Sequence, residues 1–448
     1  MVSIFVPDDY PIIQLKRALD WDEIKSVMNT HWRENGKNVD GGRGLPWPTD
    51  LYAPLLVLKW VKGYHSRQME EYLIESVVAR LFLELLEEAS LIQIRDHSSI
   101  DRAEISLGVE GKAAVNALII KTAEKLNFTN RKLVSSDTTV QEPAIGYPNE
   151  PGILKGWADR IKRSLNRLKG RGVKGVKEGM EKVKEIYTNV KKYFLFAKTK
   201  EEKDEMLSEL VKQSEELIEQ TKEVIEQIGK GCSQLKQKAA EKLRRMVEVA
   251  EKLIPQIKHW MKTGRVAKEK IIHVGITEAR SIVKGAKERV KFGMKWLINR
   301  LPGGYLFGKR VEPRADENKM PEEGLKHFRE LFGEKETPEM VVYDRGASAP
   351  AAAKVLKAEG VQKVGIHPRG QGKWMVGKKD QRIVKSERGK TEGSIGRLKS
   401  RKYGFSHRQE RSVKTQDAAG QKAIVSVNLN TLMRDLVEQA KSVASAQC

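Results

Sequence analysis

The sequence predicts a mixed α/β protein in which helices precede a strand-containing core and a long helical insertion interrupts that core. Three observations lead to this class. Residues 1–129 show mainly helical periodicity of apolar side chains, whereas short apolar runs typical of buried strands occur at 132–137 and 340–344. Residues 155–285 carry almost no strand signal and are rich in Lys and Glu. Such differences in apolar periodicity distinguish helices from strands.

The first predicted region, residues 1–129, consists of short helices joined by turns. A Gly/Pro-rich loop at 41–48 separates an early periodic stretch from a helix that Thr49 and Asp50 are expected to cap. Because the helices are short and the turns are tight, the region is compatible with a helix-turn-helix DNA reader. An ordinary helical bundle explains the same pattern equally well.

Further helices are expected in the second half of this region. One covers Gln68–Val78, and another carries the leucines at 81, 83, 85 and 86. A third is expected to start near His97, with Ser98 or Ser99 as its N-cap, since serine side chains accept hydrogen bonds from free helical N–H groups.

The first part of the core is expected in residues 130–154. The run Lys132–Asp137 predicts a buried strand that ends at the acidic residue Asp137. A segment rich in turn-forming Pro and Gly follows it.

The helical insertion spans residues 155–285. Apolar residues recur every seven positions through Leu210, Leu217 and Val224, which predicts long, coiled-coil-like helices. Pro255 is expected to kink or end one of them. Three uses of this insertion deserve comparison: a self-packed helical hairpin without further function, a dimerisation element, and a surface that contacts DNA phosphates.

The remainder of the core, residues 286–448, returns to mixed structure. Alternating apolar residues on both sides of Gly303 and Gly304 predict a hairpin. The later elements are expected to be a helix at Pro321–Phe332, a strand at Glu339–Asp344, a helix at Ala349–Glu359, a strand at Val361–Ile366, a helical segment opened by Glu392 and a last helix at 417–444. This order fits an RNase H-like core with a helical insertion after its first strand. In such a sheet the strands of Asp137 and Asp344 lie side by side.

Three acidic residues are the candidate catalytic groups: Asp137, Asp344 and Glu392. Carboxylate oxygens suit Mg²⁺ or Mn²⁺, and a pair of such ions catalyses in-line displacement at phosphodiesters. We therefore expect Asp137 and Asp344 to bind both ions and Glu392 to bind one. Each residue taken alone is more often a turn-capping Asp or a solvated Glu; their joint context favours catalysis.

The third acidic residue belongs to a longer motif. Arg388, Glu392 and Lys399 have the spacing Arg-x3-Glu-x6-Lys, which resembles the signature around the last glutamate of DDE transposases from prokaryotic insertion sequences. That family usually has a Tyr three residues before the Arg, where this chain has Lys385.

Other segments extend the resemblance. Ser135–Thr139 and Tyr343–Gly346 are similar to the family's first and second Asp motifs, and Ser66–Glu71 followed by Asp96–Ile100 resembles its N-terminal domain. The resemblance implies an enzyme that binds terminal inverted repeats through residues 1–129, hydrolyses a phosphodiester and joins the freed 3′-hydroxyl to target DNA. It also implies a homo-oligomer, with a dimer favoured.

Two basic residues of the motif are candidate DNA contacts. Arg388 lies one helical turn before Glu392, and Lys399 lies two turns after it on the same face. Both are expected to contact phosphate oxygens of the element end, and an arginine can do so bidentately. Because many other basic residues crowd this segment, membership of a generally basic surface is the alternative.

His367 and Trp374 follow the last predicted strand. A histidine near metals or a tryptophan stacked on an unpaired base would be functional. A packed Trp and a hydrogen-bonded loop His are the commoner arrangement, and the neighbouring glycines form no phosphate-binding fingerprint.

Composition indicates the partners. The formal net charge is +23 and the pI is near 9.7, which favours nucleic acid over other partners. Only Cys232 and Cys448 are present, so neither a disulfide framework nor a cysteine zinc site is expected. The N-terminus lacks signal-peptide features, and Leu51–Val61 is too short to span a bilayer. We expect a cytoplasmic, nucleoid-associated protein without membrane contact.

Two other functions explain part of the pattern. An RNase H-like nuclease would cut DNA without strand transfer. A DNA-binding or coiled-coil scaffold would carry the acidic residues incidentally. Metal-dependent nicking separates an enzyme from a scaffold, and joining of the cut end to target DNA separates a transposase from a nuclease.

Overall fold

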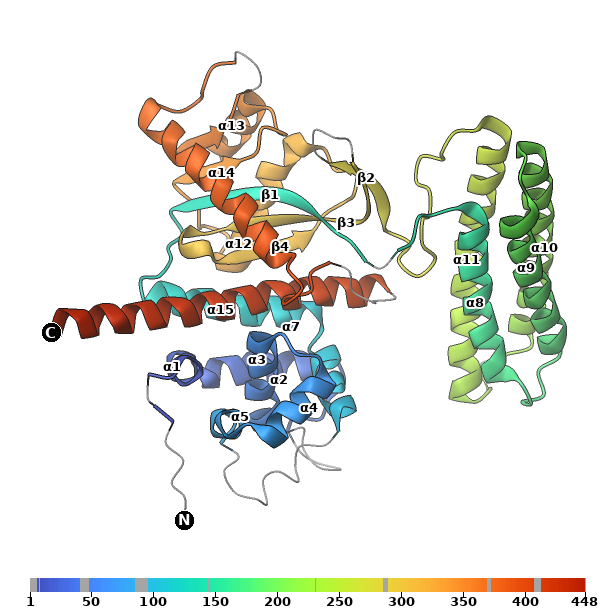
Figure 1. Ribbon diagram of the computed structural model, residues 1–448, viewed down its shortest axis with the longest axis horizontal. Coiled ribbons are helices and arrows are strands. Elements are labelled where there is room, and N and C mark those ends of the chain that lie inside the picture. Colours follow the sequence, from blue (N-terminus) through green and yellow to red (C-terminus); the bar gives the residue numbers. More distant parts are fainter. Residues whose placement is uncertain are drawn as a thin grey trace. The chain divides into compact units, whose positions relative to one another are not determined.

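The computed structural model describes residues 6–7, 9–40, 48–84, 96–143, 145–229, 231–284, 289–368, 372–406 and 412–447. The chain divides into two compact units (Figure 1): unit 1 contains Met1–Ala144 and Met294–Cys448, and unit 2 contains Ile145–Gly293. Residues 41–47 of the predicted loop at 41–48, and the leucines at 85 and 86, lie outside the described residues. No helix among the described residues is both long enough and apolar enough to cross a membrane.

A mixed sheet forms the centre of unit 1, as predicted for an α/β protein. Its strands are β1 (Leu133–Gln141), β3 (Arg289–Arg300), β4 (Leu306–Arg310), β5 (Met340–Tyr343) and β6 (Lys363–Ile366). The spatial order is β4-β3-β1-β5-β6, in which β1, β5 and β6 are parallel and β3 runs antiparallel to its neighbours. The strands of Asp137 and Asp344 are therefore adjacent, as predicted.

Helices cover both faces of this sheet. They are α12 (Met320–Phe332) and α13 (Ala349–Ala358) on one face, and α14 (Lys378–Leu398) and α15 (Val413–Gln447) on the other. On the α14 face, a Cβ at Gly365 of β6 would lie 2.4 Å from Val384 Cγ2, so glycine allows α14 to approach the sheet closely. On the α12 face, Ser136 Oγ donates to Asn299 Oδ1 (2.6 Å) beneath that helix. Side chains that alternate along each strand thus contact different helices.

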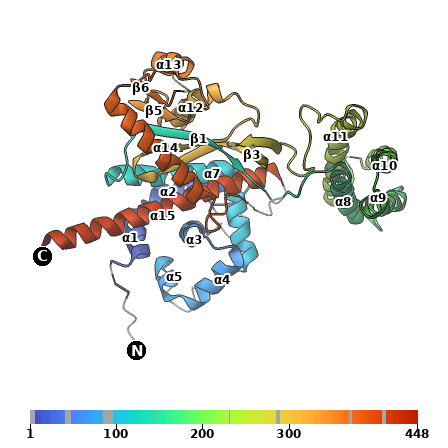
Figure 2. The same ribbon diagram turned by 45° about the horizontal axis from the view of Figure 1, so that its top comes forward.

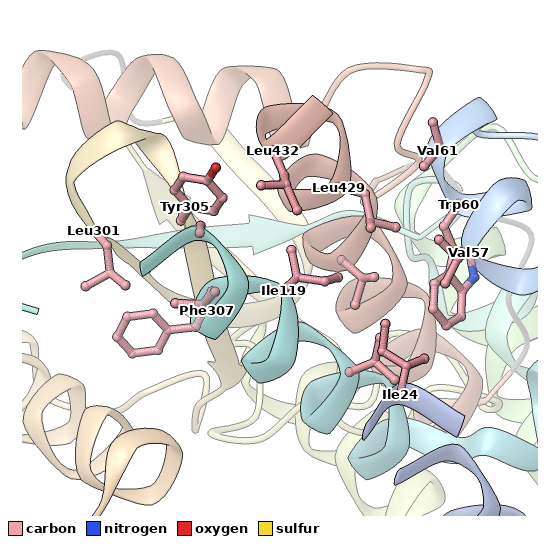
Figure 3. Packing of buried hydrophobic residues seen from close by; sticks show 14 of the residues in the cluster. Ile24, Val57, Trp60, Val61, Ile119, Leu301, Tyr305, Phe307, Leu429 and Leu432 are labelled. Atoms are coloured by element: carbon pink, nitrogen blue, oxygen red, sulfur yellow. The ribbon is translucent and has the colours of Figure 1, made fainter. Parts of the chain in front are cut away.

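The N-terminal helices share a core with the sheet. They are α1 (Pro11–Ala18), α2 (Trp21–Glu34), α3 (Thr49–Lys62), α4 (Ser66–Glu75), α5 (Val77–Phe82) and α7 (His97–Lys125). One cluster of buried apolar side chains joins these helices, α15 and the strands, and Figure 3 shows its centre around Ile119, Leu429 and Tyr305. The predicted serine cap of α7 is wrong: Asp96 is the N-cap, and its side chain accepts from Ser99 N.

The described residues of unit 2 form four helices: α8 (Glu150–Leu168), α9 (Val176–Phe196), α10 (Lys200–Glu226) and α11 (Gln234–Thr263). They pack around a single apolar core, and both ribbon views show them side by side (Figures 1 and 2). Leu210, Leu217 and Val224 lie in this core with no exposed surface. The apolar stripe predicted from the sequence is therefore covered within the insertion itself.

Two further features of unit 2 bear on the predictions. Pro255 lies inside α11, which continues to Thr263, so the expected end of a helix at this proline did not occur. After the bundle, β2 (Arg280–Lys284) pairs antiparallel with the first residues of β3. β2 and the start of β3 form the hairpin through which the chain returns to the sheet of unit 1.

Candidate functional site

Asp137 and Asp344 lie at the same level of two neighbouring strands. β1 continues to Gln141, so Asp137 occupies the middle of its strand rather than the end that the sequence predicted. β5 ends at Tyr343, and Asp344 follows it directly. Because Ser136 and Tyr343 are partners in the parallel pair, the next position on each chain is Asp137 and Asp344. The predicted position at the end of a strand is correct for Asp344 and wrong for Asp137. The strand of Asp137 continues through a segment of Thr, Val and Gln residues, which are less apolar than the run that precedes it.

Glu392 reaches this region on α14. The helix starts at Lys378, so Glu392 lies in its interior and does not open it, contrary to the sequence prediction. Thr391, the preceding residue, is buried and its Oγ1 is 2.7 Å from Ser135 Oγ on β1. Ser135 and Asp137 are two residues apart and therefore face the same side of the sheet. The Thr391–Ser135 contact thus places the Glu392 segment over the face that carries Asp137.

A buried ion pair fixes the same helix against β3. Arg300, the partner of Ser135 in the antiparallel β1–β3 pair, donates from Nη1 to Glu387 Oε2 at 2.6 Å. Both side chains are nearly inaccessible, with exposed fractions of 8% and 11%. Burial lowers the pKa of Arg300, and Glu387 opposes that shift. Removing Glu387 would leave the guanidinium of Arg300 buried without its carboxylate partner, so this pair holds the position of α14 firmly.

Arg388 lies between two of the predicted acidic ligands. Its Nη2 forms an ion pair with Asp344 Oδ1 and lies 3.6 Å from Glu392 Oε1. Asp344 Oδ1 is buried and accepts no well-aligned hydrogen bond, so its contact with Arg388 is mainly one of charge. Glu392 remains 64% exposed. Among the described residues no group of three His, Cys, Asp or Glu side chains is close enough to hold a metal ion.

Glu317 braces the two aspartate positions from the opposite face of the sheet. It begins a short 3-10 turn, Glu317–Lys319. Its Oε1 accepts from Thr138 Oγ1 at 3.2 Å and lies 2.8 Å from Lys295 Nζ, while its Oε2 accepts from the hydroxyl of Tyr343 at 2.7 Å. Thr138 follows Asp137, and Tyr343 precedes Asp344. One carboxylate therefore ties together the neighbours of both aspartates.

The hydroxyl of Tyr343 remains a hydrogen-bond donor in this arrangement. Burial, followed by the charges of Glu317, Asp137 and Asp344, raises the pKa of Tyr343 far above its ordinary value. The same turn also holds the loop after Asp344, because Asn318 Oδ1 accepts from Ser348 N at 2.7 Å. Sequence reasoning missed Glu317, and no local signal marks it, since its partners lie far away in the chain.

Lys399 and the loop after β6 complete the set of predicted residues. Lys399 is the C-cap of α14, and its Nζ lies 3.9 Å from Glu142 Oε1, just beyond the end of β1. It is thus not grouped with Arg388 and Asp344. The rings of His367 and Trp374 pack edge to face with centroids 4.8 Å apart, and Trp374 contacts the small cluster of Met340, Val342 and Val384. The prediction of a packed tryptophan is confirmed.

Residues 2–104 match a family model described as a transposase domain (DUF772). The match lies within the N-terminal helices and includes none of the five predicted site residues. No curated protein and no solved structure matches the chain. The matched segment supports a transposase family and, with it, a function on DNA.

Proposed function

We propose that the protein is a DDE transposase of a prokaryotic insertion sequence, which cleaves the ends of its element and joins the 3′-hydroxyl to target DNA. One observation carries this proposal. Asp137 and Asp344 occupy equivalent levels of adjacent parallel strands, and α14 brings Glu392 to the same face through Thr391 and Ser135. Three carboxylates from distant parts of the chain thereby approach one edge of one sheet.

The sheet supports assigning an RNase H-like core. β1 is central, β3 and β4 extend the sheet on one side with β3 antiparallel to both of its neighbours, and β5 and β6 lie parallel to β1 on the other side. The insertion leaves the core between the first and second of these strands. The order of these strands along the chain, the adjacency of β1 and β5 and the insertion point are those expected from the sequence.

The donor set fits divalent metal ions. Asp137, Asp344 and Glu392 would offer hard carboxylate oxygens, which Mg²⁺ and Mn²⁺ prefer, and the poorly hydrogen-bonded Oδ1 of Asp344 is suited to accept a cation. A pair of such ions stabilises the attacking and leaving oxygens at a phosphodiester. In the arrangement described here the guanidinium of Arg388 neutralises Asp344. Arg388 must therefore release Asp344 when a metal binds, and it would then be free to contact a DNA phosphate.

The N-terminal helices would recognise the terminal repeats. α3 and α4 are joined by Gly63–His65, a turn in which Gly63 adopts a left-handed backbone conformation, and this arrangement favours a helix-turn-helix. The exposed side of α4 carries Arg67 and Gln68 but also Glu71 and Glu75. Phosphate contacts must then come from neighbouring elements, while Arg67 and Gln68 are suited to base edges.

Replacement of the three carboxylates tests the proposal. Asp137→Asn, Asp344→Asn and Glu392→Gln should each reduce Mg²⁺-dependent cleavage of an element end by roughly 10³-fold or more, and a double variant should be hardly worse than a single one. Binding of the end DNA, measured without metal, should not change. Glu330→Gln, which removes one charge from an exposed residue of α12 that pairs with Lys309, is the matched control and should cleave normally.

The outcomes separate the candidate functions. A variant that cleaves at nearly the wild-type rate removes its residue from the site. Cleavage without joining of the 3′-end to a target plasmid would make the protein a nuclease. A wild-type chain that binds DNA but never nicks it, in either Mg²⁺ or Mn²⁺, would support the scaffold.

A further inference from the structure

The four helices of unit 2 differ sharply in charge. α10 contains ten acidic and four basic residues, whereas α11 contains three acidic and eight basic residues. α8 carries five basic residues and two acidic ones, of which Asp159 accepts a hydrogen bond from the hydroxyl of Tyr187. α8 and α11 pack directly against each other, as both ribbon views show (Figures 1 and 2). One side of the bundle is therefore basic.

Ion pairs cross the seams between α10 and its two neighbours. Lys258 of α11 lies 2.5 Å from Glu215, Lys222 of α10 lies 3.7 Å from Glu251, and Lys182 of α9 lies 2.7 Å from Glu216. These three lysines are thus engaged by carboxylates, and the side of the bundle formed by α10 carries an acidic excess.

Within the described part of the chain, six basic residues of the α8–α11 side have no such partners. Two stripes run along it at helical spacing: Arg163 and Arg167 on α8, and Lys238, Lys242, Arg245 and Lys252 on α11. All six side chains are exposed. No ion pair within the described part of the chain engages any of them. Glu241 and Glu248 border the α11 stripe, and Glu269 and Glu278 line the same groove as Arg245 and Lys252. The six basic residues outnumber these four acidic ones, so the face keeps a positive excess.

The two helices position the stripes close together. The indole of Trp157 on α8 donates to the carbonyl of Met246 on α11 at 2.8 Å, which fixes the relative height of the helices. The apolar residues of both helices point into the bundle core. The outer face of α8 and α11 is therefore formed by polar and charged side chains. The α11 stripe extends over about 21 Å at 1.5 Å per residue, the length of roughly six base pairs of duplex at 3.4 Å each.

We propose that this face, defined by Arg163, Arg167, Lys238, Lys242, Arg245 and Lys252, binds the phosphate backbone of double-stranded DNA without reading its sequence. Identifying the polyanion as DNA depends on the proposed function. The face itself depends only on the arrangement of charges in unit 2. Basic side chains that neutralise phosphates release condensed counterions, so their contribution is measurable as a salt dependence.

The test measures binding of the full-length protein to a fluorescein-labelled random-sequence duplex of 30 base pairs, in metal-free buffer, over a range of salt concentrations. Arg163→Ala with Arg167→Ala should weaken binding about tenfold near 100 mM salt and flatten the slope of log K against log[salt] by roughly 2. Lys203→Ala with Lys212→Ala removes the same charge from exposed positions of α10 and should leave both quantities unchanged. Arg163→Lys with Arg167→Lys should restore the slope.

Equal salt slopes for the Arg→Ala pair and the wild type would overturn the proposal, as would equal losses in the Arg→Ala and Lys→Ala pairs. Stronger competition by poly-glutamate than by unlabelled duplex would assign the face to an acidic protein instead. Because no metal is present, the result is independent of cleavage. A chain that binds DNA here but never cuts it contradicts only the transposase proposal. If the protein cuts element ends but the Arg→Ala pair has the same salt slope as the wild type, only the proposal for the α8–α11 face is contradicted.

Discussion

At the scale of single residues, charge is balanced differently at the candidate site and beneath it. Arg388 approaches Asp344 and Glu392 from α14, where Glu392 is largely exposed and a cation can be exchanged. Glu317 and Lys295 form a separate pair on the opposite face, where the ammonium side chain is only 5% exposed. Arg388 is thus suited to release its carboxylates and bind them again, whereas the pair of Glu317 and Lys295 is suited to fixing the strands.

Glu317→Gln tests this positioning role. The amide keeps one acceptor oxygen but places an N–H₂ donor against a hydroxyl donor of Tyr343 or Thr138. We expect the cleavage rate to fall, and the Mg²⁺ concentration for half-maximal cleavage to rise, by about 10- to 100-fold. DNA binding without metal should be unchanged, which a general loss of structure would not allow.

Glu323→Gln provides the control, because Glu323 is a partly exposed residue of α12 whose partners are surface lysines. It should not alter the Mg²⁺ requirement. If Glu317→Gln lowers the rate with no change in that requirement, Glu317 does not position the metal ligands.

At the scale of elements, the sequence predicted most helices and strands because their apolar periodicity is strong. The order from β3 to α15 follows from such patterns. The boundaries near the site are different. Glu392 does not begin α14, because the preceding residues Lys378–Arg388 are polar but helical, and their burial through Val384 and Glu387 depends on the sheet. Long-range packing, which a local pattern does not contain, decided that boundary.

The α12 layer predicts a specific pH dependence. His327 packs against the ring of Phe307 and lies 3.4 Å from Asn299 Nδ2. Burial, reinforced by Lys309, lowers the pKa of His327 from 6.5 to about 3. The unfolded chain takes up this proton below pH ~6.5 while the folded chain does not, so the free energy of unfolding should fall with falling pH across that window.

Chemical denaturation at pH 7 and pH 5 measures the effect. Between pH 7 and pH 5, His327 should lower the free energy of unfolding of the wild type by about 2 kcal/mol. His327→Gln should remove this part of the decrease. Carboxylates elsewhere titrate in both proteins and cancel in the comparison. An equal pH dependence in the two proteins would mean that His327 is accessible to protons in the folded state.

At the scale of the whole molecule, the sequence predicted that residues far apart would meet and that an insertion interrupts the core, but not that the N-terminal helices belong to the same compact unit as the sheet. The N-terminal helices share one hydrophobic core with the sheet, since α7 and α15 pack along each other over many residues. Amphipathic periodicity shows that a helix has a buried side without identifying what covers it. For the same reason, the stripe through Leu210 and Leu217 was equally consistent with a second subunit until the bundle core was seen.

The two chain connections to unit 2 lie close together, so unit 2 can be replaced by a short loop. Gln141 and Met294 are direct partners in the antiparallel β1–β3 pair, so their Cα atoms are about 4.5–5.5 Å apart. A glycine-containing loop of about four residues in place of Ile145–Gly293 can therefore close the two strands as an ordinary hairpin. The core would keep every strand pair from β1 to β6 that the candidate site requires.

We expect the shortened protein to unfold cooperatively near the wild-type temperature and to retain Asp137, Asp344 and Glu392 in a cleavage-competent arrangement. Its affinity for duplex DNA should fall, and its salt slope should decrease by up to ~5 if all six basic residues of the α8–α11 face contact phosphates. Its oligomeric state in light scattering should match that of the intact chain, because the apolar stripe is covered within the insertion. A shortened protein that is monomeric when the intact one is dimeric would show instead that the insertion carries the subunit interface.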